Sequence, residues 1–236
     1  MAAVKHVNAL RNMLSALARF APEQRCLLCD ASSGDAPVCP QCVQTLPRLA
    51  LHCPRCALPS PGGQLCGACL AVPPAFDATL AAWTYSFPVD RLVIAFKFHA
   101  RLQLAPWFAA ALAPLVPRNV DRLVALPLHR QRLAERGFNQ AHEIARHLQR
   151  LCGTPLLGRG LRRKRATGEQ ARLPHDSRSR NVRGAFECAV DLEGCAVAVI
   201  DDVMTTGATL QEFAKTLKRA GADRVVNCVL ARTLLQ

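Results

Sequence analysis

Val-Ile-Asp-Asp-Val-Met-Thr-Thr-Gly-Ala-Thr-Leu, at residues 199–210, is the stretch that decides the fold. Apolar residues lead into two adjacent carboxylates, Asp201 and Asp202, and a turn rich in hydroxyl groups follows before a helix-like sequence. Because side chains alternate along a strand, paired acids at its end present carboxylates on both sides. Backbone N–H groups at the start of the helix favour an anion. The stretch therefore predicts a site for a phosphorylated sugar.

The sequence around this stretch alternates between predicted strands and predicted helices. We expect strands at 76–87, 122–126, 154–157, 186–190, 196–203 and 224–230, and helices at 89–115, 140–151 and 210–220. Pro106 is expected to interrupt the first helix. This alternation predicts an α/β fold with a parallel sheet flanked by helices, in which ligands bind at the carboxyl ends of the strands. Asp201 and Asp202 lie at such an end.

Composition limits the classes of protein that the chain can represent. With 236 residues, half of them hydrophobic, it is long enough for one α/β domain and a smaller module. A formal net charge of +13 favours polyanionic partners such as nucleic acid or phosphorylated substrates. No apolar run approaches the roughly 18 residues of a membrane helix. Lys5, Arg11 and Arg19 interrupt the N-terminus, which therefore predicts an amphipathic helix at 1–22 and a soluble cytoplasmic protein.

Eight of the twelve cysteines form four Cys-x-x-Cys pairs, and the second four repeat the first four 27 positions later. A disulfide framework is typical of secreted chains, and nothing here indicates export. Tetrahedral zinc explains all eight, because a four-cysteine site needs two tight turns that each present two thiolates. We expect two structural zinc ions, and a sequential assignment is the simplest, although the spacing also permits an interleaved one. The predicted ligands are Cys26, Cys29, Cys39 and Cys42 for one ion, and Cys53, Cys56, Cys66 and Cys69 for the other.

Residues 199–210 resemble the phosphoribosyl pyrophosphate (PRPP) motif of the type I phosphoribosyltransferases. The resemblance implies that Asp201 and Asp202 hold the ribose hydroxyls and act in catalysis, with Mg²⁺ bridging the ribose and the phosphates. It assigns the 5′-phosphate to the turn formed by Thr205, Thr206, Gly207, Ala208 and Thr209. Enzymes of purine salvage carry an extra acid at the position of Thr205, so the motif is more similar to the orotate type.

Further segments resemble the ComF family, bacterial proteins linked to DNA uptake and natural transformation. These segments are Leu126–Arg130, Arg136–Ala141, Arg165–Gln170 and Arg180–Phe186. The resemblance implies a double zinc ribbon at 23–72 and a phosphoribosyltransferase-like domain at 76–236. It also implies that Leu128, His129 and Arg130 bind pyrophosphate. Two alternatives stay open here: His129 bonds only its own loop, and Asn139 or Gln140 caps the next helix.

Residues 159–183 form a long basic loop. Its position matches the loop that closes over the active site in phosphoribosyltransferases, where closure excludes water. The same arginines are also suited to DNA phosphates. Glu169, His175 and Asp176 are the candidates in this loop for a general acid or base.

The sequence thus predicts a PRPP-binding protein that transfers phosphoribose to an unidentified acceptor and releases pyrophosphate. Whether it is an enzyme stays open, because a fold does not dictate turnover. The alternatives are a PRPP or nucleotide sensor without catalysis, and an accessory protein that binds single-stranded DNA or docks a competence helicase.

Overall fold

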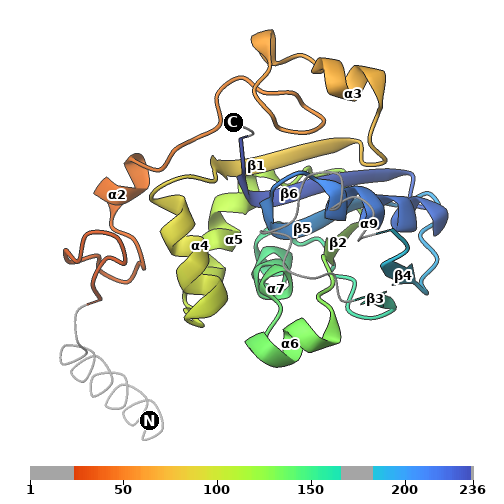
Figure 1. Ribbon diagram of the computed structural model, residues 1–236. Coiled ribbons are helices and arrows are strands. Elements are labelled where there is room, and N and C mark those ends of the chain that lie inside the picture. Colours follow the sequence, from red (N-terminus) through yellow and green to blue (C-terminus); the bar gives the residue numbers. More distant parts are fainter. Residues whose placement is uncertain (1–23, 166–182, 235–236) are drawn as a thin grey trace, which may run out of the picture. The chain divides into compact units, whose positions relative to one another are not determined.

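The computed structural model describes residues 24–165 and 183–234, in two compact units divided after Gln44 (Figure 1). The first unit contains the short helix α2 (Pro40–Gln44). The second contains the other elements, beginning with the 3₁₀ turn η1 (Pro61–Gly63) and helix α3 (Gly67–Ala71). The helix expected at 1–22 lies outside the described residues. Within 24–165 and 183–234, no helix combines the length and the apolar character that crossing a membrane requires.

A four-stranded parallel sheet forms the centre of the second unit, in the order β1-β6-β5-β2. Its strands are β1 (Ala78–Thr84), β2 (Arg122–Ala125), β5 (Ala196–Met204) and β6 (Arg224–Arg232). The predicted α/β class is confirmed. β5 and β6 are buried along most of their length, which is why they read as continuous apolar runs.

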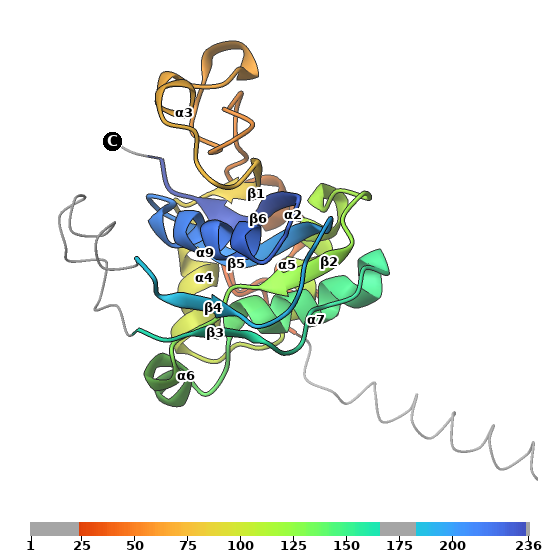
Figure 2. The same cartoon turned by 90° about the vertical axis from the view of Figure 1, so that its right-hand side faces the viewer.

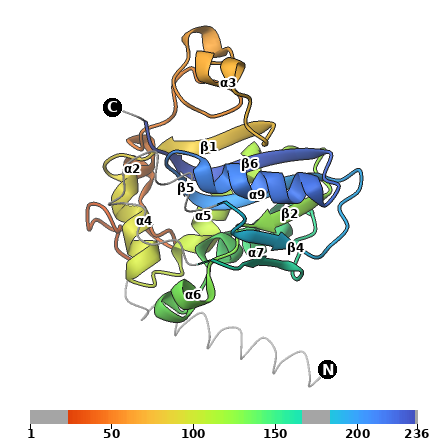
Figure 3. The same cartoon turned by 45° about the vertical axis from the view of Figure 1, so that its right-hand side comes forward.

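Helices cover both faces of this sheet (Figures 2 and 3). Helices α5 (Leu104–Leu112) and α7 (Gln140–Cys152) pack on one face, and α9 (Ala208–Arg219) packs on the other. Successive side chains of β5 point to opposite faces of the sheet. Val197 and Val199 belong to the core cluster that contains Phe213 of α9. Helix α4 (Val89–Phe98) and the turn η2 (Ala113–Leu115) flank α5.

Pro106 does not interrupt a helix, contrary to the expectation for residues 89–115. It is the third residue of α5, within the first turn, where the missing N–H costs no hydrogen bond. The break comes at residues 99–103, where α4 ends and Ala100 adopts a left-handed φ of 48°.

Two of the expected strands do not form strands of the parallel sheet. β4 (Phe186–Cys188) pairs antiparallel with β3 (Leu161–Arg163) in a separate two-stranded sheet. Phe186 nevertheless packs on Phe213, with ring centroids 4.9 Å apart. The apolar residues of this segment therefore indicate that it is buried, but they do not indicate which strand pairs with it. Residues 154–157 provide a single bridge, from Leu156 to Leu123.

The outer edge of β1 is covered by the chain that precedes it. Thr84 N donates to Pro47 O at 2.8 Å, and Thr79 N donates to Pro54 O at 3.1 Å. Exposed sheet edges otherwise invite pairing with other chains. The segment that carries the second cysteine cluster is therefore fixed to the sheet by backbone hydrogen bonds.

Candidate functional site

An open cleft of about 580 Å³ lies where β2 and β5 end. Its walls include the paired acids, the turn that follows β5 and the loop that follows β2. The lining residues predicted from sequence are Leu128, His129, Asp201, Asp202, Thr205, Thr206, Gly207, Ala208 and Thr209. The fold thus brings two segments about 70 residues apart to one edge of the sheet, as expected for parallel strands.

The two acids differ in their surroundings. Asp202 is buried, with 8% of its surface exposed, and its Oδ1 accepts from Lys97 Nζ at 2.8 Å and from Val203 N at 2.6 Å. Asp201 is partly exposed, and its Oδ1 accepts from Asp202 N at 2.9 Å. Asp202 is therefore held by a cation, while Asp201 lines the cleft.

This arrangement perturbs the titration of Asp201. Burial, together with the charge of Asp202, raises the pKa of Asp201 to about 7, against the opposing charges of Lys97 and Arg163. A carboxyl with such a pKa is ionised most readily when a cation or a hydroxyl donor binds beside it. Perturbed acids of this kind are typical of functional sites.

The raised pKa of Asp201 predicts a stability that falls with pH. Between the ordinary pKa of 3.8 and about 7, the folded state binds more protons than the unfolded state. The free energy of unfolding of the ligand-free protein should therefore decrease as pH rises through this window, and Asp201→Asn should remove that component. Urea unfolding of both proteins at several pH values measures it. A difference between them that does not change with pH would contradict the assignment.

The turn after β5 has the geometry of an anion site. Gly207 caps α9 with a left-handed φ of 82°, a conformation that other residues rarely adopt. Thr206 Oγ1 accepts weakly from Ala208 N at 3.4 Å, and Thr205 is exposed. The first residues of this twelve-residue helix line the cleft, so its electropositive end lies there.

The loop after β2 is fixed by two helix caps. His129 caps α6 (Arg130–Arg136), because its Nδ1 accepts from Gln131 N at 3.3 Å. Asn139 caps α7 through His142 N at 3.3 Å, and its Nδ2 donates to Leu126 O at 3.0 Å. His129 thus bonds within its own loop and Asn139 caps the next helix, as the sequence alternatives proposed. Both residues also line the cleft.

The cations at the cleft differ from those singled out in the sequence. Arg130 is exposed at the first turn of α6 and does not line the cleft, whereas Arg132 and Arg136 do. Lys97 of α4 and Arg163 of β3 also line it. Lys97 lies in the helix expected at 89–115, where the sequence gives no sign that it reaches this cleft. Glu169, His175 and Asp176 lie outside the described residues.

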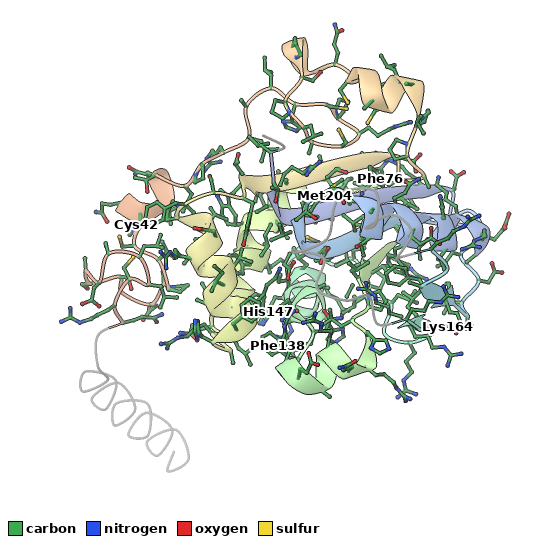
Figure 4. The ribbon with its side chains drawn as sticks, viewed as in Figure 1. Cys42, Phe76, Phe138, His147, Lys164 and Met204 are labelled. Atoms are coloured by element: carbon green, nitrogen blue, oxygen red, sulfur yellow. The ribbon has the colours of Figure 1, made fainter. Side chains whose placement is uncertain are left out.

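Arg136 connects this cleft to a smaller neighbouring one of about 230 Å³. Its guanidinium lies 5.3 Å from the ring centroid of Phe98, and its Nη1 donates to Gln140 Oε1 at 2.8 Å. Burial lowers the pKa of Arg136, and the charge of Asp202 opposes that shift. Phe138 of the same cleft is labelled in Figure 4.

The eight paired cysteines form two clusters, and the grouping is sequential. Within each cluster, the four sulfur atoms lie within 4.8 Å of one another. The pairs Cys29–Cys39 and Cys56–Cys66 are each 3.7 Å apart. A tetrahedron with zinc–sulfur bonds of about 2.3 Å has edges of about 3.8 Å. The donor sets thus fit four-coordinate zinc, and a closed four-thiolate site is structural.

The sequence duplication is repeated in the backbone. Cys26 N donates to Ala31 O at 2.8 Å, and the equivalent Cys53 N donates to Leu58 O at 2.8 Å. The residues that follow the two knuckles, Asp30 and Ala57, both have a left-handed φ, of 62° and 58°. Helices α2 and α3 are also equivalent in the repeat. The two clusters are therefore copies of one ribbon unit.

Two family profiles match the chain. One is described as "Double zinc ribbon domain" and covers residues 16–70, and the other as "Phosphoribosyl transferase domain" and covers residues 133–234. Fold, cysteine clusters and profiles together define a tandem zinc ribbon followed by a phosphoribosyltransferase-like domain.

Curated relatives match most of the chain. "DNA utilization protein YhgH" of Salmonella typhimurium is 34% identical over 84% of this chain and 91% of its own length. "Competence protein F" of Haemophilus influenzae is 29% identical over 88% and 90%, and "Competence protein ComFC" of Bacillus subtilis is 28% identical over 83% and 89%. The chain belongs to the ComF family.

Solved phosphoribosyltransferase structures resemble it more distantly. Glutamine PRPP amidotransferase of Bacillus subtilis gives a TM-score of 0.38 at 21% identity, over 53% of this chain and 25% of that chain. A purine phosphoribosyltransferase of Pyrococcus horikoshii gives 0.37 at 21% identity, over 53% and 72%.

Proposed function

We propose that the cleft binds PRPP with Mg²⁺, in a domain at residues 76–236 that follows a double zinc ribbon at 23–72. One observation carries the proposal: the paired acids after β5 and the helix N-terminus beside them open onto the same cleft as the loop after β2. Acids suit ribose hydroxyls and Mg²⁺, while a helix N-terminus suits a phosphate. Few ligands besides a phosphorylated sugar present both groups at this spacing.

The residues of the cleft take distinct roles in this proposal. Asp201 and Asp202 would hold the ribose hydroxyls and a Mg²⁺ ion, which would supply positive charge against the phosphates. The turn at 205–209 holds the 5′-phosphate. Leu128 and His129 approach the pyrophosphate through the loop after β2, and the nearby cations Lys97, Arg132, Arg136 and Arg163 stabilise its charge.

The proposed reaction is displacement of pyrophosphate from the anomeric carbon. A nitrogen nucleophile forms a bond to that carbon while the bond to the pyrophosphate oxygen breaks, and the electron pair leaves with pyrophosphate. The nucleophile loses its proton to a base, for which Glu169 stays the sequence candidate. Arg130, exposed at the start of α6, contacts pyrophosphate only if its side chain turns toward the cleft.

A non-catalytic role in DNA uptake is the second candidate. It is supported by the names of the relatives, which refer to DNA utilization and competence, and by the net charge of +13. In this version the cleft senses PRPP, and the protein binds single-stranded DNA or docks a competence helicase.

A pyrophosphate-release assay separates the two candidates. The protein is incubated with PRPP, Mg²⁺ and a panel of nucleobases and amines, with PRPP alone as the blank. Release that depends on one acceptor establishes a transferase. PRPP binding without release for any acceptor supports the sensor, and the absence of PRPP binding contradicts both.

A further inference from the structure

Arg232 is the largest fully buried side chain among the described residues, and no part of the proposed reaction uses it. It ends β6, next to Met204 at the end of β5. Met204 is labelled in Figure 4 and immediately precedes the phosphate turn. We propose that Arg232 is a positioning residue that couples zinc occupancy of the second ribbon to the conformation of the phosphate turn. The functional part of this inference rests on the proposed PRPP site.

The hydrogen bonds of Arg232 run in two directions. Nε donates to Cys56 O at 2.8 Å, and Cys56 is a ligand of the second cysteine cluster. Nη1 donates to Met204 O at 3.0 Å, to Thr205 O, and to Thr233 O at 2.7 Å. One guanidinium thus joins a metal-binding knuckle to the first carbonyls of the turn.

The position of Cys56 explains why the link depends on the metal. The carbonyl that accepts from Arg232 belongs to the residue whose sulfur atom lies in the second cluster, so an ion held by that cluster would also hold the carbonyl in place. Loss of the metal frees the knuckle to open, which removes the Cys56 carbonyl as an acceptor.

The other end of the link acts on the turn. Because Arg232 holds the carbonyls of Met204 and Thr205, it fixes the start of the turn whose residues line the cleft. Anion sites of this kind depend on preset backbone geometry. A turn that loses this anchor should open more often and bind a phosphate less tightly.

The two ribbons supply a matched pair of variants. Cys66→Ser weakens the second cluster, and Cys39→Ser weakens the first at the equivalent position of the repeat. The readouts are zinc content, hydrogen exchange of residues 203–210 and PRPP affinity with Mg²⁺. We expect Cys66→Ser to speed exchange of the turn about tenfold and to weaken PRPP about tenfold, and Cys39→Ser to leave both unchanged.

Arg232→Lys distinguishes coupling between the second ribbon and the turn from a general loss of stability of the protein. It keeps a buried cation but lacks the planar fork that reaches both groups of carbonyls. In this variant both zinc ions should stay bound, exchange of the turn should rise as in Cys66→Ser, and adding Cys66→Ser should cause no further rise. Equal effects of the two cysteine variants, or additive effects of Cys66→Ser and Arg232→Lys, would overturn the coupling. If Arg232→Lys does not fold, the cysteine pair decides alone.

The exchange measurement needs no ligand, so it distinguishes the two proposals. A turn that responds to Cys66→Ser in a protein without PRPP affinity supports the coupling and refutes the PRPP site.

Discussion

Replacement of Asp201 and Asp202 together by asparagine should abolish the stabilisation of the protein by PRPP with Mg²⁺. At about one hundred times its Kd, a ligand stabilises the folded state by about 2.7 kcal/mol. For a protein of this size, that corresponds to a rise in Tm of roughly 5–10 °C. Asp201 and Asp202 both line the cleft, and Asp202 also bonds Lys97. Removal of both carboxylates should therefore reduce the ligand-induced rise in Tm to near zero. Thermal unfolding with and without ligand measures it.

Asp223→Asn provides the matched control for this experiment. Asp223 is exposed and directly precedes β6, so it lies at the end of the parallel strands opposite to the cleft. This variant loses the same charge and should keep the full shift in Tm. A normal shift in the double variant would show that PRPP does not bind at the paired acids.

Removal of zinc should produce the largest loss of structure. In the second ribbon the buried core cluster consists of Cys53, Cys56 and Cys69. Segments of this length are too short to fold without a metal or disulfide, and structural zinc contributes about 10–16 kcal/mol in small domains. After chelation, trypsin should cleave rapidly after Arg48 and Arg55, which mass spectrometry detects.

Restored zinc is the control for chelation. Protein that retains about two zinc ions should resist cleavage at both sites, and re-addition of zinc should restore that resistance. Anaerobically purified protein with almost no zinc and the same resistance to trypsin would contradict the metal assignment.

The parts of the site that local sequence encodes could be predicted. Residues 199–210 contain a strand end, a turn and a helix start in one run, so their relative positions follow from the backbone alone. The cysteine clusters were likewise predictable, because a four-thiolate site constrains the spacing of its ligands. The predicted ligand roles of these cleft residues, and the boundaries of the modules, stay predictions.

The remaining parts depend on packing between distant segments. Lys97 reaches Asp202 only because α4 packs beside the end of β5, and nothing near residue 97 indicates this. Arg232 lies beyond the strand expected at 224–230, and nothing near it in the sequence indicates that its guanidinium joins the second ribbon to the turn. The pairing of β4 with β3 was also missed, because an apolar run does not reveal which neighbour buries it.

Calorimetric titration of the zinc-loaded protein with PRPP in the presence of Mg²⁺ tests the central claim most directly. We predict saturable binding of one PRPP per chain, much weaker binding without Mg²⁺, and none to the variant that carries Asp201→Asn and Asp202→Asn. Absence of heat at millimolar PRPP, or equal binding to that variant, would contradict a PRPP site at the end of β5.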